Sequence, residues 1–221
     1  MTFQELNSKI IACRQCARLV EWREQVGREK RAAYKSETYW AKPVPGFGDT
    51  QARVLILGLA PGAHGSNRTG RMFTGDSSGN FLYPALFRAG FSSSDTSLNL
   101  EDGLQLFDAY ITAAGRCAPP GNKPTPLELG NCKSWLTQEL ELLPNIRVIL
   151  ALGKIAHDTM LEYHRLKKSQ YPFGHALEYL LPDGKLLLDS YHVSQQNTQT
   201  GKLTTEMFDG VLERVKTLCL V

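Results

Sequence analysis

The chain has 221 residues, of which 42% are hydrophobic and 21% charged, a composition that excludes a disordered or low-complexity protein. Its net charge of +3 permits an anionic partner but does not require one. No apolar run approaches the ~18–20 residues of a membrane span, and residues 1–16 lack the basic start and apolar stretch of a secretory signal. We therefore expect one cytoplasmic, intracellular domain over residues 1–221, with no membrane association.

The first predicted element is a basic helix over residues 3–35. Its apolar residues recur at roughly helical spacing, namely Leu6, Ile10, Leu19, Trp22 and Val26. From Arg14 to Lys35 the chain carries seven Arg and Lys residues against three Glu residues, so this segment holds an excess of 7 − 3 = +4. This charge indicates either a solvated helical face or a surface that contacts phosphates.

Beyond a Pro- and Gly-rich connection at 39–49, four aliphatic runs predict strands, at 53–59, 108–114, 146–153 and 185–191. The first and third are apolar nearly throughout, as strands buried on both faces of a parallel sheet are. Helical segments are expected at about 79–90, 126–142, 153–166 and 201–218. Strands that alternate with helices indicate an α/β sandwich with a central, mainly parallel, four-stranded sheet. Ligands of such sheets bind beyond the carboxyl ends of the strands.

The loop after the first strand is long and rich in glycine: "GLAPGAHGSNRTGRMFTGD" at 58–76. It lacks the spacing of an NTP-binding P-loop and of a dinucleotide-binding G-x-G-x-x-G motif. Its glycines would let the backbone approach a ligand closely, and a loop of this length in a compact domain is usually functional.

Two further loops follow predicted strand ends. In "GRCAPPGNKPTP" (115–126), three prolines restrict the backbone around Asn122, whose amide either caps a turn or reads a base edge. In "YHVSQQNTQTGKLT" (191–204), His192 stands just after a strand and opens a polar stretch. A lone histidine is usually structural, but this position favours a functional site.

Four of the five cysteines are candidate metal ligands. Cys13 and Cys16 form C-x-x-C, and Cys117 and Cys132 bracket a loop and a helix start. Four thiolates hold either a tetrahedral zinc ion or an iron–sulfur cluster, although spacing alone leaves open that none of them binds metal. Cys219 is expected to be buried in the last helix.

A serine hydrolase is a competing interpretation. "GDSSG" (75–79) matches G-x-S-x-G, with Ser77 as nucleophile and Asp189 and His192 as its partners. That motif must join a strand directly to a helix, whereas Ser77 lies at the far end of a loop.

The three loop motifs and the four cysteines resemble the family 5 uracil-DNA glycosylases (the UDGb type) from Cys13 to Leu203. The resemblance implies a three-layer α/β/α sandwich of the uracil-DNA glycosylase superfamily and a [4Fe–4S] cluster held by Cys13, Cys16, Cys117 and Cys132. It implies a monofunctional glycosylase that hydrolyses the bond between deoxyribose and uracil, and other deaminated bases such as hypoxanthine, in DNA. The cellular setting would be the nucleoid and the protein a monomer. The runner-up is a non-catalytic, metal-stabilised nucleic-acid-binding module on the same fold.

The resemblance also implies site residues. Relatives place an acidic or amide residue early in the first motif, where this chain has Leu59, Ala60 and Pro61, so the polar role falls to Asp76. Val193 replaces a common proline, which relaxes the backbone after His192. Expected catalytic residues are Asp76, His192 and Asn122. Expected base contacts are Gly58, Ala60, Gly62, His64, Phe73 and Asn122, and expected DNA contacts are Arg68, Arg71, Ser194, Gln195, Gln196 and Asn197. His157, His164 and His175 are interpreted as structural or surface residues.

Overall fold

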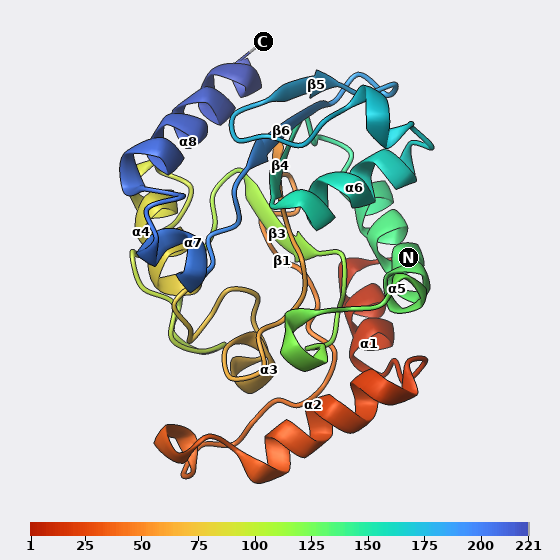
Figure 1. Cartoon of the computed structure of the whole chain (residues 1–221), viewed down its shortest axis with the longest axis vertical. Coiled ribbons are helices and arrows are strands. Elements are labelled where there is room, and N and C mark those ends of the chain that lie inside the picture. The colour runs from red at the N-terminus through yellow and green to blue at the C-terminus, as the bar shows by residue number, and fades with distance from the viewer. Residues whose placement is uncertain (221) are drawn as a thin grey trace.

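A computed structural model describes residues 1–220 and forms an α/β fold around one six-stranded sheet (Figure 1). The strand order is β1-β3-β2-β4-β6-β5. The four central strands are parallel and correspond to the four predicted runs: β2 (Val54–Gly58), β3 (Ala109–Ala113), β4 (Val148–Leu152) and β6 (Leu186–Ser190). Two antiparallel edge strands, β1 (Phe47–Gly48) and β5 (Glu178–Leu180), extend the sheet beyond the predicted four.

Helices cover both faces of the sheet, which confirms the three-layer α/β/α prediction (Figure 1). The helices are α1 (Phe3–Ile11), α2 (Ala17–Glu29), α3 (Ser66–Thr69), α4 (Gly79–Arg88), α5 (Pro126–Leu142), α6 (Lys154–Tyr163), α7 (Gln195–Gln199) and α8 (Thr205–Leu220). Short 3₁₀ turns lie at Ala32–Tyr34, Pro120–Asn122 and Lys168–Gln170. Among residues 1–220, no helix combines the length and the apolar character needed to cross a bilayer.

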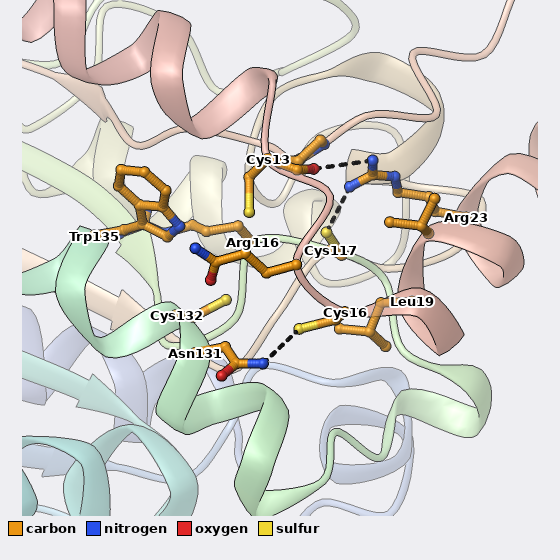
Figure 2. A pocket seen from close by; sticks show the side chains of 12 residues that line it. Cys13, Cys16, Leu19, Arg23, Arg116, Cys117, Asn131, Cys132 and Trp135 are labelled. Atoms are coloured by element: carbon orange, nitrogen blue, oxygen red, sulfur yellow. Dashed lines mark hydrogen bonds between the residues drawn. The ribbon is translucent and has the colours of Figure 1, made fainter.

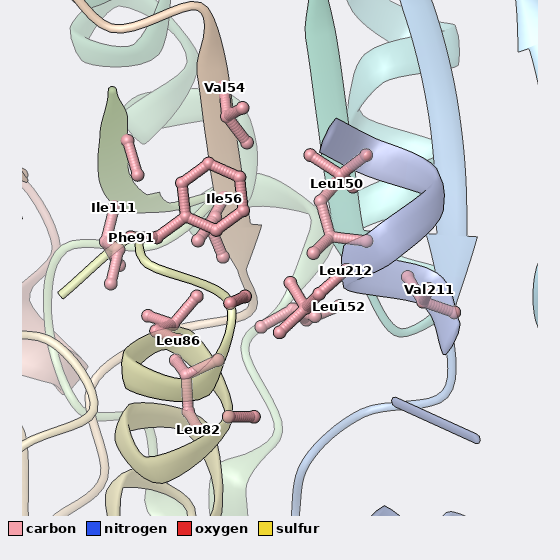
Figure 3. Packing of buried hydrophobic residues seen from close by; sticks show 14 of the residues in the cluster. Val54, Ile56, Leu82, Leu86, Phe91, Ile111, Leu150, Leu152, Val211 and Leu212 are labelled. Atoms are coloured by element: carbon pink, nitrogen blue, oxygen red, sulfur yellow. The ribbon is translucent and has the colours of Figure 1, made fainter. Parts of the chain in front are cut away.

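Alternate residues of the strands enter the two cores. Ile56 and Leu150 face one core with α4 and α8, where Leu82, Leu86, Val211 and Leu212 pack against them (Figure 3). Leu55 and Ile149 face the other core, which α5 and α6 cover. Because both faces are buried, β2, β3 and β4 are buried along their whole length, and this burial explains the apolar runs of β2 and β4.

The basic N-terminal segment is not one helix. α1 ends at Ile11 and α2 begins at Ala17, so the prediction of a continuous helix over 3–35 is wrong at 12–16 and beyond 29. Cys13 lies in the turn between the two helices, and Cys16 is the N-cap of α2. The break places both thiols at one end of α2, beside Cys117 and Cys132.

Candidate active site

A cavity of about 500 Å³ lies beyond the carboxyl ends of the parallel strands. It brings together all three predicted catalytic residues, Asp76, Asn122 and His192. Ala60, Gly62, Phe73, Ser194, Gln195 and Gln196, also predicted from the sequence, line it as well. Ser77, the candidate nucleophile of the serine-hydrolase alternative, and Leu59 of the first motif line it too. Nothing in the sequence pattern separates the remaining lining residues from ordinary loop residues: Ser66, Met72, Ser78, Ala113, Pro119 and Gly121.

Within residues 1–220, Asp76 is the one carboxylate that lines this cavity. It stands just before α4, and its Oδ1 accepts hydrogen bonds from the backbone N–H groups of Ser78 (3.0 Å) and Gly79 (3.1 Å). Burial raises the pKa of Asp76, and the two backbone donors oppose that rise. The hydrogen bonds therefore fix one carboxylate oxygen and leave Oδ2 for other partners.

The glycines of the first loop make room for Asp76. A Cβ atom on Gly65 would lie 1.9 Å from Asp76 Oδ2, and one on Gly62 would lie 2.8 Å from the same atom. No real Cβ contact is that short, so these two positions admit only glycine while Asp76 keeps its place. Close packing against Asp76 thus gives this part of the glycine-rich loop its structural reason.

Phe73 forms a wall of the cavity and is only 9% exposed. Its backbone has φ +52°, an uncommon conformation for a bulky residue and a sign of local constraint. Its ring centroid lies 6.2 Å from that of His192. Gly58 does not line the cavity but lies beneath the ring, where a Cβ would come within 2.6 Å of Phe73 Cζ. Gly58 therefore positions Phe73 and does not face a ligand.

His192 follows β6 and packs against Gly153. Because Gly153 has no side chain, the His192 side chain can lie directly against its backbone, which has a φ of +94°. Burial lowers the pKa of His192 to about 4, so the ring is neutral at pH 7. A neutral imidazole still donates one hydrogen bond. Asn197 Nδ2 donates to the His192 carbonyl at 2.8 Å, and this bond fixes the backbone at the ring.

Val193 anchors the segment after His192. Its side chain is fully buried in the core that contains α4 and α8. The loss of a proline at this position, predicted to relax the backbone, is therefore offset by packing. The next residues, expected as an irregular loop, form the one-turn helix α7, and Ser194 caps it by accepting from the N–H of Asn197. Gln195 and Gln196 project at the exposed rim of the cavity.

Asn122 also lines the cavity. It lies in the 3₁₀ turn Pro120–Asn122 with φ +56°, a left-handed conformation that asparagine tolerates better than most residues. Its backbone N–H donates to Pro119 O at 3.1 Å, and this bond fixes the backbone of the turn. The side-chain amide is exposed at the cavity, and its expected role at the base stays a prediction.

Three of the predicted contacts do not line the cavity: His64, Arg68 and Arg71. Tyr39 Oη and His64 Nδ1 are 3.0 Å apart, and burial lowers the pKa of His64. Arg68 pairs with Glu37 and donates to the carbonyls of His64 and Gly75 at 2.8 Å each. Arg71 pairs with Asp102.

Both arginine side chains are buried. Because their guanidinium groups are occupied inside the protein, they brace the first loop and do not present a surface to phosphate. Asn197, also predicted to contact DNA, directs its amide to the His192 carbonyl.

The residues of the serine-hydrolase alternative are not assembled. Ser77 lines the cavity, but the fully buried Asp189 pairs with His157 Nδ1 at 2.8 Å instead of with His192. His157 Nε2 lies 2.9 Å from the carbonyl oxygen of Tyr171, so both ring nitrogens have acceptors. His157 is therefore structural, and a Ser77–His192–Asp189 relay is excluded by this pairing.

The four predicted ligand cysteines line a second cavity, between α2, the loop before α5, and α5 itself (Figure 2). Within residues 1–220, no three His, Cys, Asp or Glu side chains are arranged to hold a single metal ion. Two of the sulfurs already have donors: Arg23 Nη1 lies 2.9 Å from Cys117 Sγ, and Asn131 Nδ2 lies 3.3 Å from Cys16 Sγ. Four thiols around one space, with polar donors behind them, form a donor set that suits a polynuclear cluster.

Known proteins resemble this chain over nearly all of its length. The model of the uracil DNA glycosylase superfamily matches residues 45–216. A type-5 uracil-DNA glycosylase of Thermus thermophilus is 60% identical over 209 residues, which are 95% of this chain and 94% of that protein. Type-5 enzymes of Mycobacterium bovis and Pyrobaculum aerophilum are 50% and 43% identical, covering 97% and 96% of this chain and 81% and 91% of their own lengths.

The resemblance inferred from the loop motifs is thereby confirmed. A type-4 uracil-DNA glycosylase of Thermotoga maritima is more distant, at 30% identity over 68% of this chain. The chain therefore belongs to the uracil DNA glycosylase superfamily, within its type-5 group.

Proposed function

We propose that this protein hydrolyses the N-glycosidic bond between uracil and deoxyribose in DNA and so initiates base excision repair. The observation that carries the proposal is one cavity that unites a partly buried carboxylate, Asp76, with a neutral imidazole, His192, and the side-chain amide of Asn122. Relatives that are 43–60% identical over almost the whole chain are named uracil-DNA glycosylases.

The target bond is inaccessible inside a duplex, so the nucleotide must leave the base stack, at a cost of a few kcal/mol. The extruded base would lie against the ring of Phe73, and the Asn122 amide would offer it a donor and an acceptor. Gln195 and Gln196, exposed at the rim on α7, are placed to contact the DNA around the vacated position.

Bond cleavage separates charge, because the deoxyribose becomes positive as the base leaves with the electron pair. Asp76 Oδ2 stabilises the positive sugar and orients the water whose oxygen bonds to the sugar carbon. The proton that this water releases passes by way of solvent to the departing base and neutralises it. His192, neutral at pH 7, donates a hydrogen bond to the oxygen on which the negative charge of the base develops. Both effects are stronger in a site from which water is excluded.

We also propose that other deaminated bases, such as hypoxanthine, are substrates. The proposed contact of Phe73 with the base is stacking of one ring face on another. Every base has such a face, so this contact does not select uracil. The cavity volume of about 500 Å³ supports a pocket that is not shaped to one small pyrimidine.

The four cysteines would hold a [4Fe–4S] cluster, which supplies a cross-link between segments far apart in the sequence. Cys13 and Cys16 belong to the N-terminal segment, Cys117 to the loop that carries Asn122, and Cys132 to α5. The cross-link would fix the Asn122 loop against the rest of the fold.

Single-turnover cleavage of a uracil-containing duplex by Asp76→Asn tests the proposal. Because the substitution removes charge from the reacting centre, it should reduce the rate constant on the order of 10²–10³-fold. Duplex binding should stay intact. Ser77→Ala, in the same cavity, is the matched control and should cleave like the wild type. Failure of the wild type to form abasic sites would leave the non-catalytic nucleic-acid-binding module as the better interpretation.

A further inference from the structure

One buried arginine has no carboxylate partner. Arg23, in α2, is 2% exposed. The other buried arginines each pair with a carboxylate: Arg68 with Glu37, Arg71 with Asp102 and Arg116 with Glu139. Among the described residues, no carboxylate oxygen comes within 4.0 Å of the Arg23 guanidinium. A buried charge without compensation is costly, so Arg23 requires an anion other than a carboxylate.

The polar contacts of Arg23 lead to the cysteine cavity. Nη1 lies 2.9 Å from Cys117 Sγ, and Nη2 donates to the Cys13 carbonyl at 3.2 Å (Figure 2). Its Nε is buried and has no hydrogen-bond partner. The planar guanidinium thus spans two of the four cysteines, on the side of the cavity away from Asn131 and Cys16.

We propose that Arg23 is the buried counter-charge of the metal–sulfur centre held by Cys13, Cys16, Cys117 and Cys132. It slows loss of the centre and raises its reduction potential. This inference rests on the cluster in the proposed function, but not on the glycosylase reaction. A centre held by four thiolates is anionic, and one-electron reduction adds a further negative charge. A fixed positive charge in contact with a thiolate stabilises both forms, and the reduced form more.

Arg23 could act instead only by packing and by its bond to the Cys13 carbonyl. Such a role would affect folding and the position of the turn after α1, but it would not alter the electrostatic potential at the cluster. The reduction potential therefore separates the two roles, because it responds to charge and changes little with local stability at constant ligation.

Three variants test the proposal. Arg23→Gln removes the charge and keeps a donor, whereas Arg23→Lys keeps the charge and loses the planar fork. Arg28→Gln, at an exposed position on the same helix, is the matched control. Each cluster-loaded protein is examined for iron content, for the rate at which a chelator bleaches the visible absorbance, and for the midpoint potential of the one-electron couple.

Arg23→Gln should lose its absorbance about tenfold faster than the wild type, as is typical when an outer partner of a metal ligand is removed. Its midpoint should fall by the equivalent of at least a tenfold change in the redox equilibrium, about 59 mV for one electron. Arg23→Lys should keep a midpoint near that of the wild type, and Arg28→Gln should match the wild type in all three measurements.

An Arg23→Gln protein with wild-type midpoint and bleaching rate would overturn the proposal. If Arg23→Gln does not fold, the midpoint potential of Arg23→Lys decides. A fall in that potential as large as the one predicted for Arg23→Gln would also overturn the proposal, because lysine keeps the positive charge. Absence of iron and absorbance in the wild type would refute the cluster itself. Wild-type protein that carries the cluster but forms no abasic sites would refute the glycosylase function and leave the role of Arg23 open to the same measurement.

Discussion

Gly65 marks how closely the Asp76 carboxylate is packed. A methyl group there would overlap Asp76 Oδ2, at 1.9 Å, so Gly65→Ala must displace the carboxylate. We expect the variant to fold and to lose uracil excision nearly as completely as Asp76→Asn. Single-turnover assays and thermal unfolding of the same preparations measure both properties.

Gly210→Ala is the control for that substitution. Gly210 lies on the exposed side of α8 with open space around its Cα, and alanine there should stabilise the helix by ~0.5–1 kcal/mol without affecting the rate. Wild-type excision by Gly65→Ala would show that the exact position of Asp76 does not matter.

The pKa values of Asp76 and His192 predict the pH dependence of the reaction. Burial raises the pKa of Asp76, so the rate constant should fall on acidification as this carboxylate takes up a proton. His192, with a pKa of about 4, stays neutral over the rest of the range. His192 itself should therefore contribute no step near the ordinary histidine pKa of about 6.5. A step there that disappears in His192→Gln would show that His192 acts as an imidazolium.

The same shift predicts a conflict between stability and activity. An acid whose pKa is raised by folding favours the folded state only when protonated, and above that pKa its ionised form destabilises the fold. Asp76→Asn keeps the Oδ1 acceptor for Ser78 and Gly79 and removes the charge. It should raise the melting temperature at pH 7, and the gain should shrink as the pH falls through the pKa of Asp76. Equal melting temperatures at pH 7 would contradict this expectation.

At the scale of elements, the sequence predicted those helix ends that are marked by neighbouring residues. The prediction of a helix at 126–142 matches α5 at both ends, and Pro126 and the Thr125–Glu128 capping box mark its start. The break at Cys13–Cys16 was missed because no proline or glycine marks it. β1 and β5 have only two and three residues, too few for an alternating pattern.

Long-range pairing explains the errors in the predicted site. Arg68 and Arg71 looked like phosphate ligands because their partners, Glu37 and Asp102, each lie 31 positions away in the sequence. Asp76, His192 and Asn122 were found because each follows a strand end or closes a specific motif, and parallel strands bring those ends together. Gly153 carried no such signal, since its role depends on the packing of His192.

α2 and α5 are joined by a pair that we expect to support the cysteine cavity. Arg18 Nε and Nη2 donate to the carboxylate of Glu128 at 2.7 and 2.6 Å, and this pairing lowers the pKa of Glu128. A carboxylate whose pKa is lowered on folding contributes stability above its ordinary pKa and loses it on acidification. Glu128→Gln should therefore lower the melting temperature at neutral pH and match the wild type in acid below both pKa values.

Glutamine preserves the capping box, so this substitution isolates the ion pair. Glu141→Gln, exposed on the same helix, is the control and should change little. A melting-temperature difference that persists unchanged in acid would assign the effect to packing and not to charge.

For the whole molecule, we expect the distribution of free positive charge to decide how the proposed DNA substrate is held. Arg68 and Arg71 are neutralised internally, so phosphate contacts must come from exposed cations. Lys123 and Lys202 are both exposed. Lys123 follows Asn122, and Lys202 comes shortly after α7, two segments that contribute to the cavity; the Lys202 ammonium lies 4.9 Å from the Tyr191 ring centroid. Exposed cations next to the segments that line the cavity suit contacts with the DNA backbone.

Salt titrations of duplex binding test this arrangement. Between ~50 and ~200 mM salt, wild-type affinity should fall steeply, and Lys123→Gln and Lys202→Gln should each reduce the slope of log K against log[salt] by about 0.9, the value for one lost phosphate contact. Lys216→Gln, in α8 where the ammonium pairs with Glu213, should leave the slope unchanged. Because Lys123 and Lys202 do not line the cavity, single-turnover rates at saturating protein should also be unaffected. Unchanged slopes in the Lys123 and Lys202 variants would place the DNA on another face, and the exposed basic residues of α2 and of the turn after it would then be the next candidates for phosphate contacts.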